Sequence, residues 1–322
     1  MTNMILAAVV GFCGALVFGR LLLPVLRRLK LGQKILEVGP NWHKSKEGTP
    51  TMGGFFFMLA ITAAMVGIGW TQMRDGHYTH LLILGFAWIY GVIGFIDDLA
   101  KVRKKRNQGL TAPQKLLLQL SAAAAFLSLM RYTGALSETV TIPFTEIAFT
   151  VPWPVYITLG ILFITGMVNA VNFTDGLDGL LSGVTLPVAV LFGLMALRAD
   201  NAGASVFAGA MTGGLLGFLW FNFHPAKVFM GDTGSLFIGG ALCGLAFALN
   251  DPLILLVIGL VYLVELLSVV LQVTYFKLTG GKRIFKMSPI HHHFEMYGWK
   301  EKKIFAVFSL VSVLLCVAGW FA

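Results

Sequence analysis

The stretch Phe95-Ile96-Asp97-Asp98-Leu99-Ala100-Lys101 ends an apolar run that begins near Leu81. It places two adjacent carboxylates, and then a lysine, at the end of a segment that can enter a membrane. A carboxylate is costly in hydrocarbon, so such a pair lies at the water boundary or belongs to a functional site. Neighbouring residues of a helix point roughly 100° apart, so the two side chains need not share one task. The pair is therefore either a polar end to a span or part of a site.

The composition of the whole chain is that of a membrane protein. Of the 322 residues, 57% are hydrophobic and 12% are charged, and the mean hydropathy is +0.80. Soluble domains are usually about a quarter charged. The net charge of +9 does not indicate a nucleic-acid partner, because the Lys and Arg residues cluster in loops between apolar runs. We expect one integral membrane domain over residues 1–322, all-α and polytopic.

Apolar runs of about 20 residues are long enough to cross a bilayer as helices. About ten such runs occur, at residues 4–26, 52–72, 80–98, 115–131, 154–172, 179–197, 204–223, 233–249, 253–276 and 303–321. Between the fourth and fifth runs, residues 132–153 alternate weakly in polarity, which indicates a small hairpin.

Basic residues are distributed unevenly between the loops, and this sets the predicted orientation. Twenty of the 24 Lys and Arg residues lie on one side, in segments 27–50, 101–115, 224–233 and 277–303. Loops rich in Lys and Arg stay in the cytoplasm. An even number of spans then places both termini outside. The aspartates at positions 97, 98, 175, 178 and 232 fall on the cytoplasmic side, so we expect the active site on that face.

A polar stripe runs from Asn169 through Asn172 and Asp175 to Asp178. Residues three apart are neighbours on a helix, but the stripe turns by about half a revolution, so an unbroken helix cannot aim all four at one ligand. Gly176 and Gly179 predict a break, where the amides of a new helix start face an anion or a base. The alternative is a polar helix cap.

Two glycine-containing motifs lie at the entrances of the second and eighth runs. Asp232, in Phe229-Met230-Gly231-Asp232-Thr233-Gly234-Ser235, is placed either to bind a hard cation such as magnesium or to cap its helix. The stretch Thr49-Pro50-Thr51-Met52-Gly53-Gly54 allows an unwound backbone or a turn followed by close helix packing.

The ninth run and the loop after it carry further polar residues. Glu265, Ser268 and Gln272 share one helical face, so they line an interior seam. An interhelical hydrogen bond explains Ser268, and Glu265 is either in an ion pair or functional. His291, His292 and His293 are adjacent, so they cannot all ligate one ion from a regular helix, and contact with an anion is favoured over a zinc site.

With these motifs in place, the chain resembles the phospho-N-acetylmuramoyl-pentapeptide transferases, within the superfamily of polyprenyl-phosphate sugar-1-phosphate transferases. The resemblance covers nearly the whole chain. The Thr-Pro-Thr-Met-Gly-Gly motif and Pro289-Ile-His-His-His-Phe-Glu295 point to the muramoyl branch.

The resemblance implies a multi-pass protein of the bacterial plasma membrane. It implies transfer of the phospho-sugar from UDP-N-acetylmuramoyl-pentapeptide to undecaprenyl phosphate, with magnesium, giving lipid I and UMP. Asp232 is then the metal ligand, and Asp97 and Asp98 are catalytic. The implied substrate-binding residues are Lys46, Lys101, Lys115, Asn172, Asp175, Gly176, Leu177, Asp178, Asn222, Phe229, Gln272, His291, His292 and His293. Homodimers are known in the family, so a homodimer is a further implied possibility.

Two other functions fit some of the same features. A sibling transferase acting on UDP-N-acetylglucosamine would share most of the motifs. A proton- or cation-coupled transporter would use the intramembrane acids as a relay. The acids other than Glu265 gather at one face rather than mid-membrane, and the sequence has no obvious internal repeat, which disfavours the transporter.

Overall fold

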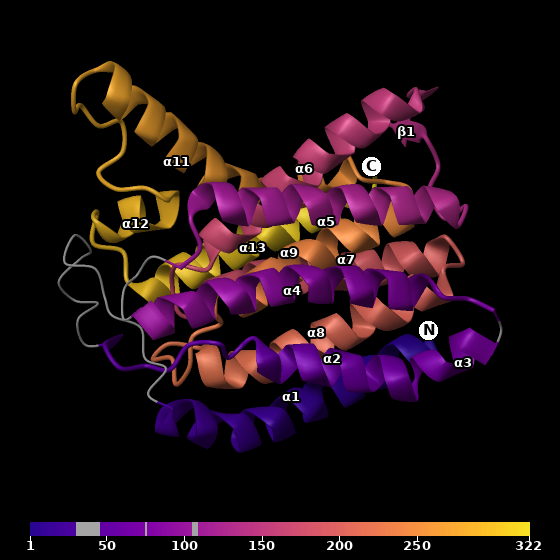
Figure 1. Ribbon diagram of the computed structural model, residues 1–322, viewed down its shortest axis with the longest axis horizontal. Helices are drawn as coiled ribbons and strands as arrows, with labels where there is room; N and C mark the ends of the chain where they lie inside the picture. The colour runs from indigo at the N-terminus through magenta and orange to yellow at the C-terminus, as the bar shows by residue number, and fades with distance from the viewer. Residues whose placement is uncertain (30–45, 75, 105–108) are drawn as a thin grey trace.

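The computed structural model describes residues 1–29, 46–74, 76–104 and 109–322. The helices of this part of the chain are α1 (Thr2–Arg28), α2 (Phe55–Gly67), α3 (Gly69–Arg74), α4 (Thr79–Lys104), α5 (Ala112–Tyr132), α6 (Trp153–Thr174), α7 (Leu180–Arg198), α8 (Ala202–Asn222), α9 (Gly231–Ala248), α10 (Ile254–Ile258), α11 (Leu260–Leu278), α12 (Ile290–Glu295) and α13 (Glu301–Gly319). The long helices run side by side in a bundle (Figure 1).

The chain forms helices because so apolar a sequence lies in the hydrocarbon of a membrane. In hydrocarbon every backbone N–H and C=O group needs an internal partner, and a helix supplies all of them within one segment. Among the described residues, eight helices are long and apolar enough to cross a membrane, namely α1, α4, α6, α7, α8, α9, α11 and α13. The prediction of an all-α polytopic membrane protein is therefore confirmed.

Each of the ten predicted runs falls on helix, but not all are continuous spans. The run 52–72 is divided at Ile68 into α2 and the short α3, and α2 has only 13 residues. The run 253–276 is divided at Gly259 into α10 and α11. Helix α5 has 21 residues, but Gln114, Lys115 and Gln119 make its first half more polar than the other spans.

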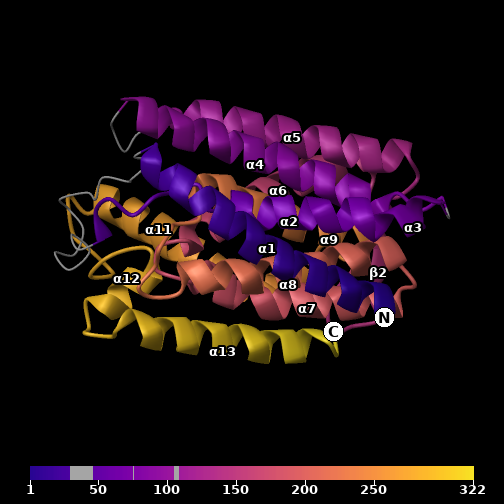
Figure 2. The ribbon, with the colours of Figure 1, turned by 90° about the horizontal axis from the view of Figure 1, so that it is seen from below.

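Helix α9 lies at the centre of the bundle, and its small residues explain how. Every residue from Thr233 to Ala248 is buried. A Cβ atom added at Gly239 would lie 2.8 Å from the Cα atom of Val168 in α6, and one added at Gly240 would lie 3.2 Å from the Cα atom of Ala87 in α4. Helices α4 and α6 therefore approach the α9 backbone closely. Figure 2 shows α9 enclosed by its neighbours, so the first turn of α9 is held firmly in place.

The two ends of the bundle differ. The chain termini, α3 and a two-stranded antiparallel sheet lie at one end (Figure 1). The sheet pairs β1 (Thr139–Thr141) with β2 (Ala148–Thr150), with Val140 opposite Phe149, which confirms the predicted hairpin. Helix α12, the end of α4 and the segment between α8 and α9 lie at the other end.

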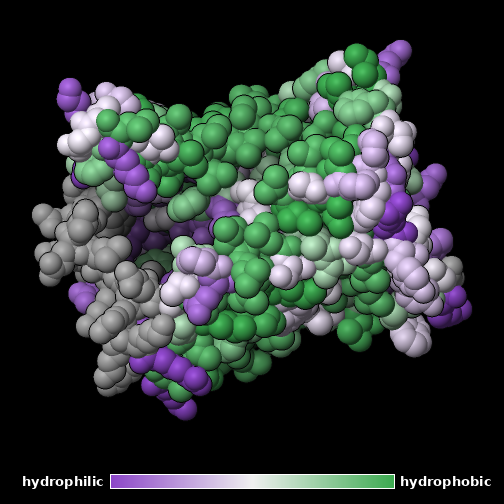
Figure 3. All heavy atoms as spheres, turned by 45° about the horizontal axis from the view of Figure 1, so that its top comes forward, coloured by the Kyte–Doolittle hydropathy of each residue, from purple (hydrophilic) through white to green (hydrophobic). Residues whose placement is uncertain are grey.

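The surface matches this arrangement. Figure 3 shows apolar side chains across the middle of the molecule and hydrophilic ones towards both ends, with hydrophilic atoms on the floor of a recess near α11 and α12. The second half of α11 leans away from the bundle and exposes Leu271, Val273 and Phe276.

Candidate active site

Three carboxylates from two helices meet at the end of the bundle that carries α12. Asp97 and Asp98 lie near the end of α4, and Asp232 lies in the first turn of α9. One oxygen from each lies within 4.8 Å of the others, close enough for the three to hold one metal ion. Asp97 and Asp98 are 3% exposed. The packing of α4 on α9 brings together three of the aspartates that the sequence places on one membrane face.

Backbone contacts fix this geometry. A Cβ atom at Gly94 would lie 2.0 Å from the carbonyl oxygen of Asp232, so only glycine lets α4 come this near to α9. The Oδ2 atom of Asp98 accepts hydrogen bonds from the backbone N–H of Thr233 (2.9 Å) and from its hydroxyl (2.8 Å). Asp98 thus caps the start of α9, where the helix dipole favours a negative charge.

Two lysines form ion pairs with the carboxylates. The Nζ atom of Lys101 lies 2.8 Å from Asp97 Oδ2, 3.4 Å from Asp98 Oδ1 and 3.0 Å from Asp232 Oδ2. Lys115, from α5, reaches Asp232 Oδ2 at 2.7 Å. Three carboxylates thus face two ammonium groups, leaving a partly exposed cluster with one net negative charge, which suits a divalent cation with oxygen ligands.

The polar stripe 169–178 divides between several neighbours. Helix α6 ends at Thr174 and α7 begins after Gly179, whose φ is +76°, so the predicted break is confirmed. Asn172 donates to Asp232 Oδ1 (3.0 Å) and to Ser235 (2.7 Å). Asn169 donates instead to Gln119 (2.7 Å) in α5. Asn172 therefore belongs to the carboxylate cluster, and Asn169 holds helices together.

Asp178 anchors a second polar cluster. Its oxygens accept from Lys46 Nζ (2.8 Å) and from the backbone N–H of Ala226 (3.0 Å), and one lies 3.0 Å from His224 Nδ1. Lys46 also reaches Glu301 Oε2 at 2.7 Å. Asp178, His224 and Glu301 have the grouping of a metal site, but the Lys46 ammonium already bridges two of the acids.

Glu301 is a site residue that the sequence reasoning missed. It begins α13 within the lysine-rich segment Lys300-Glu301-Lys302-Lys303, where a charged residue reads as an ordinary helix start. Nothing in the local pattern indicates that α13 would pack beside the turn carrying Asp178. His224, which precedes a proline between α8 and α9, contacts the same carboxylate.

The other predicted residues near this cluster form hydrogen bonds with backbone groups. Asn222 accepts from the Gly179 N–H (3.0 Å) and donates to the Val228 carbonyl (2.9 Å), so it ties the start of α7 to the segment before α9. Gly53 and Gly54 donate to the carbonyls of Phe229 and Met230 at 2.9 and 3.0 Å. The glycine motif therefore has both predicted features. Its backbone is unwound where it pairs with Phe229 and Met230, and Gly54 packs directly against Gly234 of α9. Phe229 is half-buried beside it.

The turn between α6 and α7 lies between the two clusters. Asp175 is half-buried, and its burial together with the nearby charges of Asp232, Asp98 and Asp178 raises its pKa well above the usual range for an aspartate. Leu177 is buried and Gly176 is exposed. The turn therefore presents an unusually proton-retaining carboxyl group beside an open glycine.

Gln272 and the histidines form a third region. Gln272 Oε1 accepts from the backbone N–H groups of Ile284 and Phe285, both at 3.0 Å, and its amide donates to the Phe285 carbonyl. His293 accepts from the Lys286 N–H, and His292 Nδ1 lies 2.6 Å from Glu295. The Ser268 hydroxyl donates to the Glu265 carbonyl of its own helix, so the expected interhelical bond of Ser268 is wrong.

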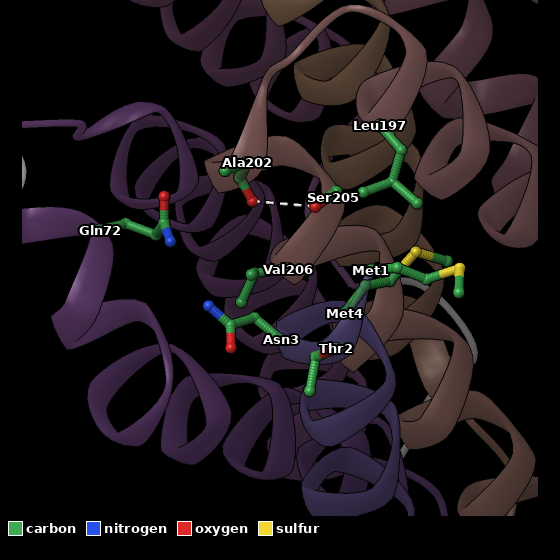
Figure 4. Close-up of a pocket in the computed structure, with 9 residues that line it drawn as sticks. All are labelled: Met1, Thr2, Asn3, Met4, Gln72, Leu197, Ala202, Ser205 and Val206. Carbon is green, nitrogen blue, oxygen red and sulfur yellow. Dashed lines mark hydrogen bonds between the residues drawn. The ribbon is translucent and has the colours of Figure 1, made fainter.

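A cavity of about 220 Å³ lies at the opposite end of the bundle. Residues from α1, α3, α7 and α8 line it, and no acidic or basic side chain is among them (Figure 4). A phosphate-bearing substrate pairs best with cationic side chains, which the carboxylate and lysine cluster offers and the side chains lining this cavity do not. The carboxylate end is therefore the candidate active site.

Comparison of the sequence with known proteins identifies the family of this chain. The sequence matches the family described as Glycosyl transferase family 4 over residues 80–250, a stretch containing Asp97, Asp98 and Asp232. It is 43% identical to the phospho-N-acetylmuramoyl-pentapeptide-transferase of Clostridium acetobutylicum, over 98% of each chain. It is 45% identical to that of Acetivibrio thermocellus, over 98% of this chain and 93% of that one. The chain belongs to the phospho-N-acetylmuramoyl-pentapeptide-transferase family.

The similarity to these relatives also includes the site residues that lie outside residues 80–250. The transferase of Caldanaerobacter subterraneus subsp. tengcongensis is 44% identical over 99% of this chain and 98% of its own. Lys46, Gln272, Glu301 and the histidines of α12 therefore fall within the aligned length of a phospho-N-acetylmuramoyl-pentapeptide-transferase. The resemblance read from the motifs is confirmed.

Proposed function

We propose that this protein transfers phospho-N-acetylmuramoyl-pentapeptide from its UDP carrier to undecaprenyl phosphate, releasing UMP and forming lipid I for peptidoglycan synthesis. The carrying observation is the convergence of Asp97, Asp98 and Asp232 with Lys101 and Lys115 at one end of a membrane bundle. Family membership supports the substrate pair. Both substrates are anionic, and one of them is anchored in lipid, so a charged cluster at a membrane boundary suits them.

The proposal includes a topology. We infer ten spans, with α2 and α5 completing the set, both termini outside and the carboxylate end in the cytoplasm of the bacterium. The concentration of Lys and Arg in the segments at that end supports this orientation. A homodimer stays a prediction.

Magnesium is the proposed cofactor. Asp97, Asp98 and Asp232 offer oxygen ligands close together, and hard cations that bind phosphate substrates prefer such ligands. The three carboxylates and the two lysines, Lys101 and Lys115, together carry one net negative charge. This charge favours binding of a cation, so the residues fit magnesium. When bound, magnesium would neutralise pyrophosphate charge and polarise the phosphoryl oxygens.

The proposed reaction exchanges one pyrophosphate bond for another. An oxygen of the lipid phosphate attacks the β-phosphorus of the donor, a new P–O bond forms, and the bond to the bridging oxygen breaks, so UMP leaves with that oxygen and its electron pair. Because one pyrophosphate replaces another, the main barrier is the approach of two anions. Lys101 and Lys115 lower that barrier by placing ammonium groups beside the reacting phosphates.

The carboxylates have separate proposed roles. Asp97 accepts from the Leu110 N–H (2.8 Å) and pairs with Lys101, so it orients that lysine. One oxygen of Asp98 is held by Thr233, and the other faces Lys101, which makes Asp98 the base or orienting group for the lipid phosphate. The phosphate monoester has its second pKa near about 6, so it is largely deprotonated at neutral pH and is competent for direct attack.

The proposed donor pocket lies around the Asp175–Asp178 turn. By family resemblance Gly176, Leu177, Asp178 and Phe229 surround the uridine, and the neighbouring polar residues support them. The hydrogen-bond acceptors of Asp178, now facing Lys46 and Ala226, are of the type that a uracil N–H requires.

The test is UMP release by purified protein supplied with a polyprenyl phosphate and one UDP-sugar at a time. The proposal expects turnover with UDP-N-acetylmuramoyl-pentapeptide and not with UDP-N-acetylglucosamine. Turnover with only the latter would identify the sibling activity, and the absence of UMP with either donor would refute the transferase function.

A further inference from the structure

A buried acid and a buried histidine pair beneath the candidate site. Glu265, on α11, and His291, on α12, are each 0% exposed. Glu265 Oε2 lies 3.0 Å from His291 Nδ1. No role in the reaction described above uses Glu265.

The pair leaves two polar atoms free. Within the described part of the chain, Glu265 Oε1 and His291 Nε2 are buried and lack a hydrogen-bond partner. Buried polar atoms are nearly always satisfied, and an unsatisfied one destabilises the fold, so each such atom calls for an explanation. A purely structural pair would gain nothing from leaving Nε2 open.

The free nitrogen lies against the donor turn. A Cβ atom at Gly176 would lie 2.1 Å from His291 Nε2 and 2.5 Å from its Cε1 atom. The imidazole edge is therefore in contact with the exposed glycine between Asp175 and Asp178. Gly176 covers Nε2 in this conformation, so the donor reaches the nitrogen where this turn moves aside.

Glu265 determines which nitrogen faces the turn. A carboxylate only accepts hydrogen bonds, so the Nδ1 atom of His291 must carry a proton and donate it to Oε2. The second nitrogen then points away from Glu265, towards Gly176. The neighbouring His292 ring packs on His291 with centroids 4.2 Å apart, which limits tilting but does not select between the two nitrogens.

We propose that Glu265 is a positioning residue that acts through His291, holding Nε2 ready to contact the UDP-linked donor. This deepens the proposed function and rests on it. The alternative is a purely structural role, in which the pair only holds α12 against α11. Gln272 has such a role through its hydrogen bonds to Ile284 and Phe285.

A double-mutant cycle separates the two roles. Glu265→Met keeps the length of the side chain but removes both oxygens that could accept from His291 Nδ1. His291→Asn keeps a polar atom near the Nδ1 position, able to bond Glu265, and removes Nε2. Ser268→Ala is the matched control, since Ser268 lies on the same buried face and its hydroxyl donates to a carbonyl of its own helix.

Each single variant and the double variant should show the same rise in KM for the UDP-linked donor, roughly tenfold, as expected for a lost hydrogen bond to a charged partner. The KM for the lipid phosphate and the melting temperature should stay near wild type, and Ser268→Ala should change neither KM. Independent, additive effects of the two substitutions would overturn the inference. So would equal changes in both KM values with a lowered melting temperature.

The same cycle is measured on the dissociation constant for UMP by calorimetry, which does not require turnover. Coupled losses of UMP affinity in a protein that fails to use the muramoyl donor would keep the Glu265–His291 inference and refute the proposed substrate. Unchanged UMP affinity in every variant, with normal donor KM, would refute the positioning role.

Discussion

Asp232→Asn tests the centre of the proposed site, because three neighbours converge on this one carboxylate. Its Oδ2 atom accepts from Lys101 (3.0 Å) and Lys115 (2.7 Å), and its Oδ1 atom accepts from Asn172 (3.0 Å). The amide removes the charge that makes the cluster attractive to a divalent cation. It also turns an NH₂ group towards a lysine or an amide that is itself a donor.

The expected loss combines these two effects. Removing a charged ligand next to a pyrophosphate costs several kcal/mol of transition-state stabilisation, which is on the order of a thousandfold or more in rate. The protein should still fold, since the capping of α9 depends on Asp98 rather than on Asp232.

The assay follows UMP release in detergent over a series of magnesium concentrations, with melting temperature as the check on folding. Asp251→Asn is the matched control, because Asp251 follows the last residue of α9, Ala248, whereas Asp232 lies in the first turn of that helix. Near-normal turnover of Asp232→Asn at ordinary magnesium would show that this aspartate only serves the helix start, and the assignment of the metal ligand would be wrong.

Three further predictions follow from the structure and the topology. Cysteines introduced at residues 101–104 or 280–300 should resist a membrane-impermeant reagent applied to intact cells, and labelling of 280–300 from outside would reverse the assigned face of the site. In metal-free protein, Asp175→Asn should raise the melting temperature at pH 8 and much less at pH 4. The raised pKa means that the folded state retains a proton that the unfolded state loses, so wild-type stability falls as pH rises above the usual aspartate range; an equal effect at both pH values would refute this. Enzyme given only the UDP-linked donor should release no burst of UMP, because the lipid phosphate is the nucleophile; a burst equal to the enzyme concentration, lost in Asp98→Asn, would instead support a covalent intermediate.

The sequence predicted those features that depend on solvent and on local geometry. Hydrocarbon requires helices, so the ten apolar runs all fall on helix, and Gly176 with Gly179 marked the break before α7. The shared face of Glu265, Ser268 and Gln272 followed from helical periodicity, and all three are buried. Periodicity shows which face of a helix a residue lies on, but it does not show which group that residue contacts. The predicted interhelical bond of Ser268 was therefore wrong, because its hydroxyl bonds within its own helix.

The features that were missed depend on contacts between distant segments. Glu301 reaches the backbone and the lysine partner of Asp178 across 123 residues, and no local pattern in the lysine-rich segment signals this. The central position of α9 depends on matching glycines in several helices, such as Gly94 against Asp232 and Gly54 against Gly234. Such matches are properties of pairs of helices, and one sequence does not show which helices pair.

The two clusters have different charge balances, and the proposed mechanism gives each a different role. Around Asp97, Asp98 and Asp232, acids outnumber lysines, which suits a cation and the phosphates it accompanies. Around Asp178, the Ala226 N–H, His224 and Lys46 contact the acid, which supports the proposed role of that cluster in donor recognition. Of the Asp98 oxygens, Oδ2 is committed to Thr233 and Oδ1 faces Lys101. Under the proposed mechanism the lipid phosphate attacks with its own charged oxygen, and Asp98 Oδ1, which lies 3.4 Å from Lys101, orients that phosphate.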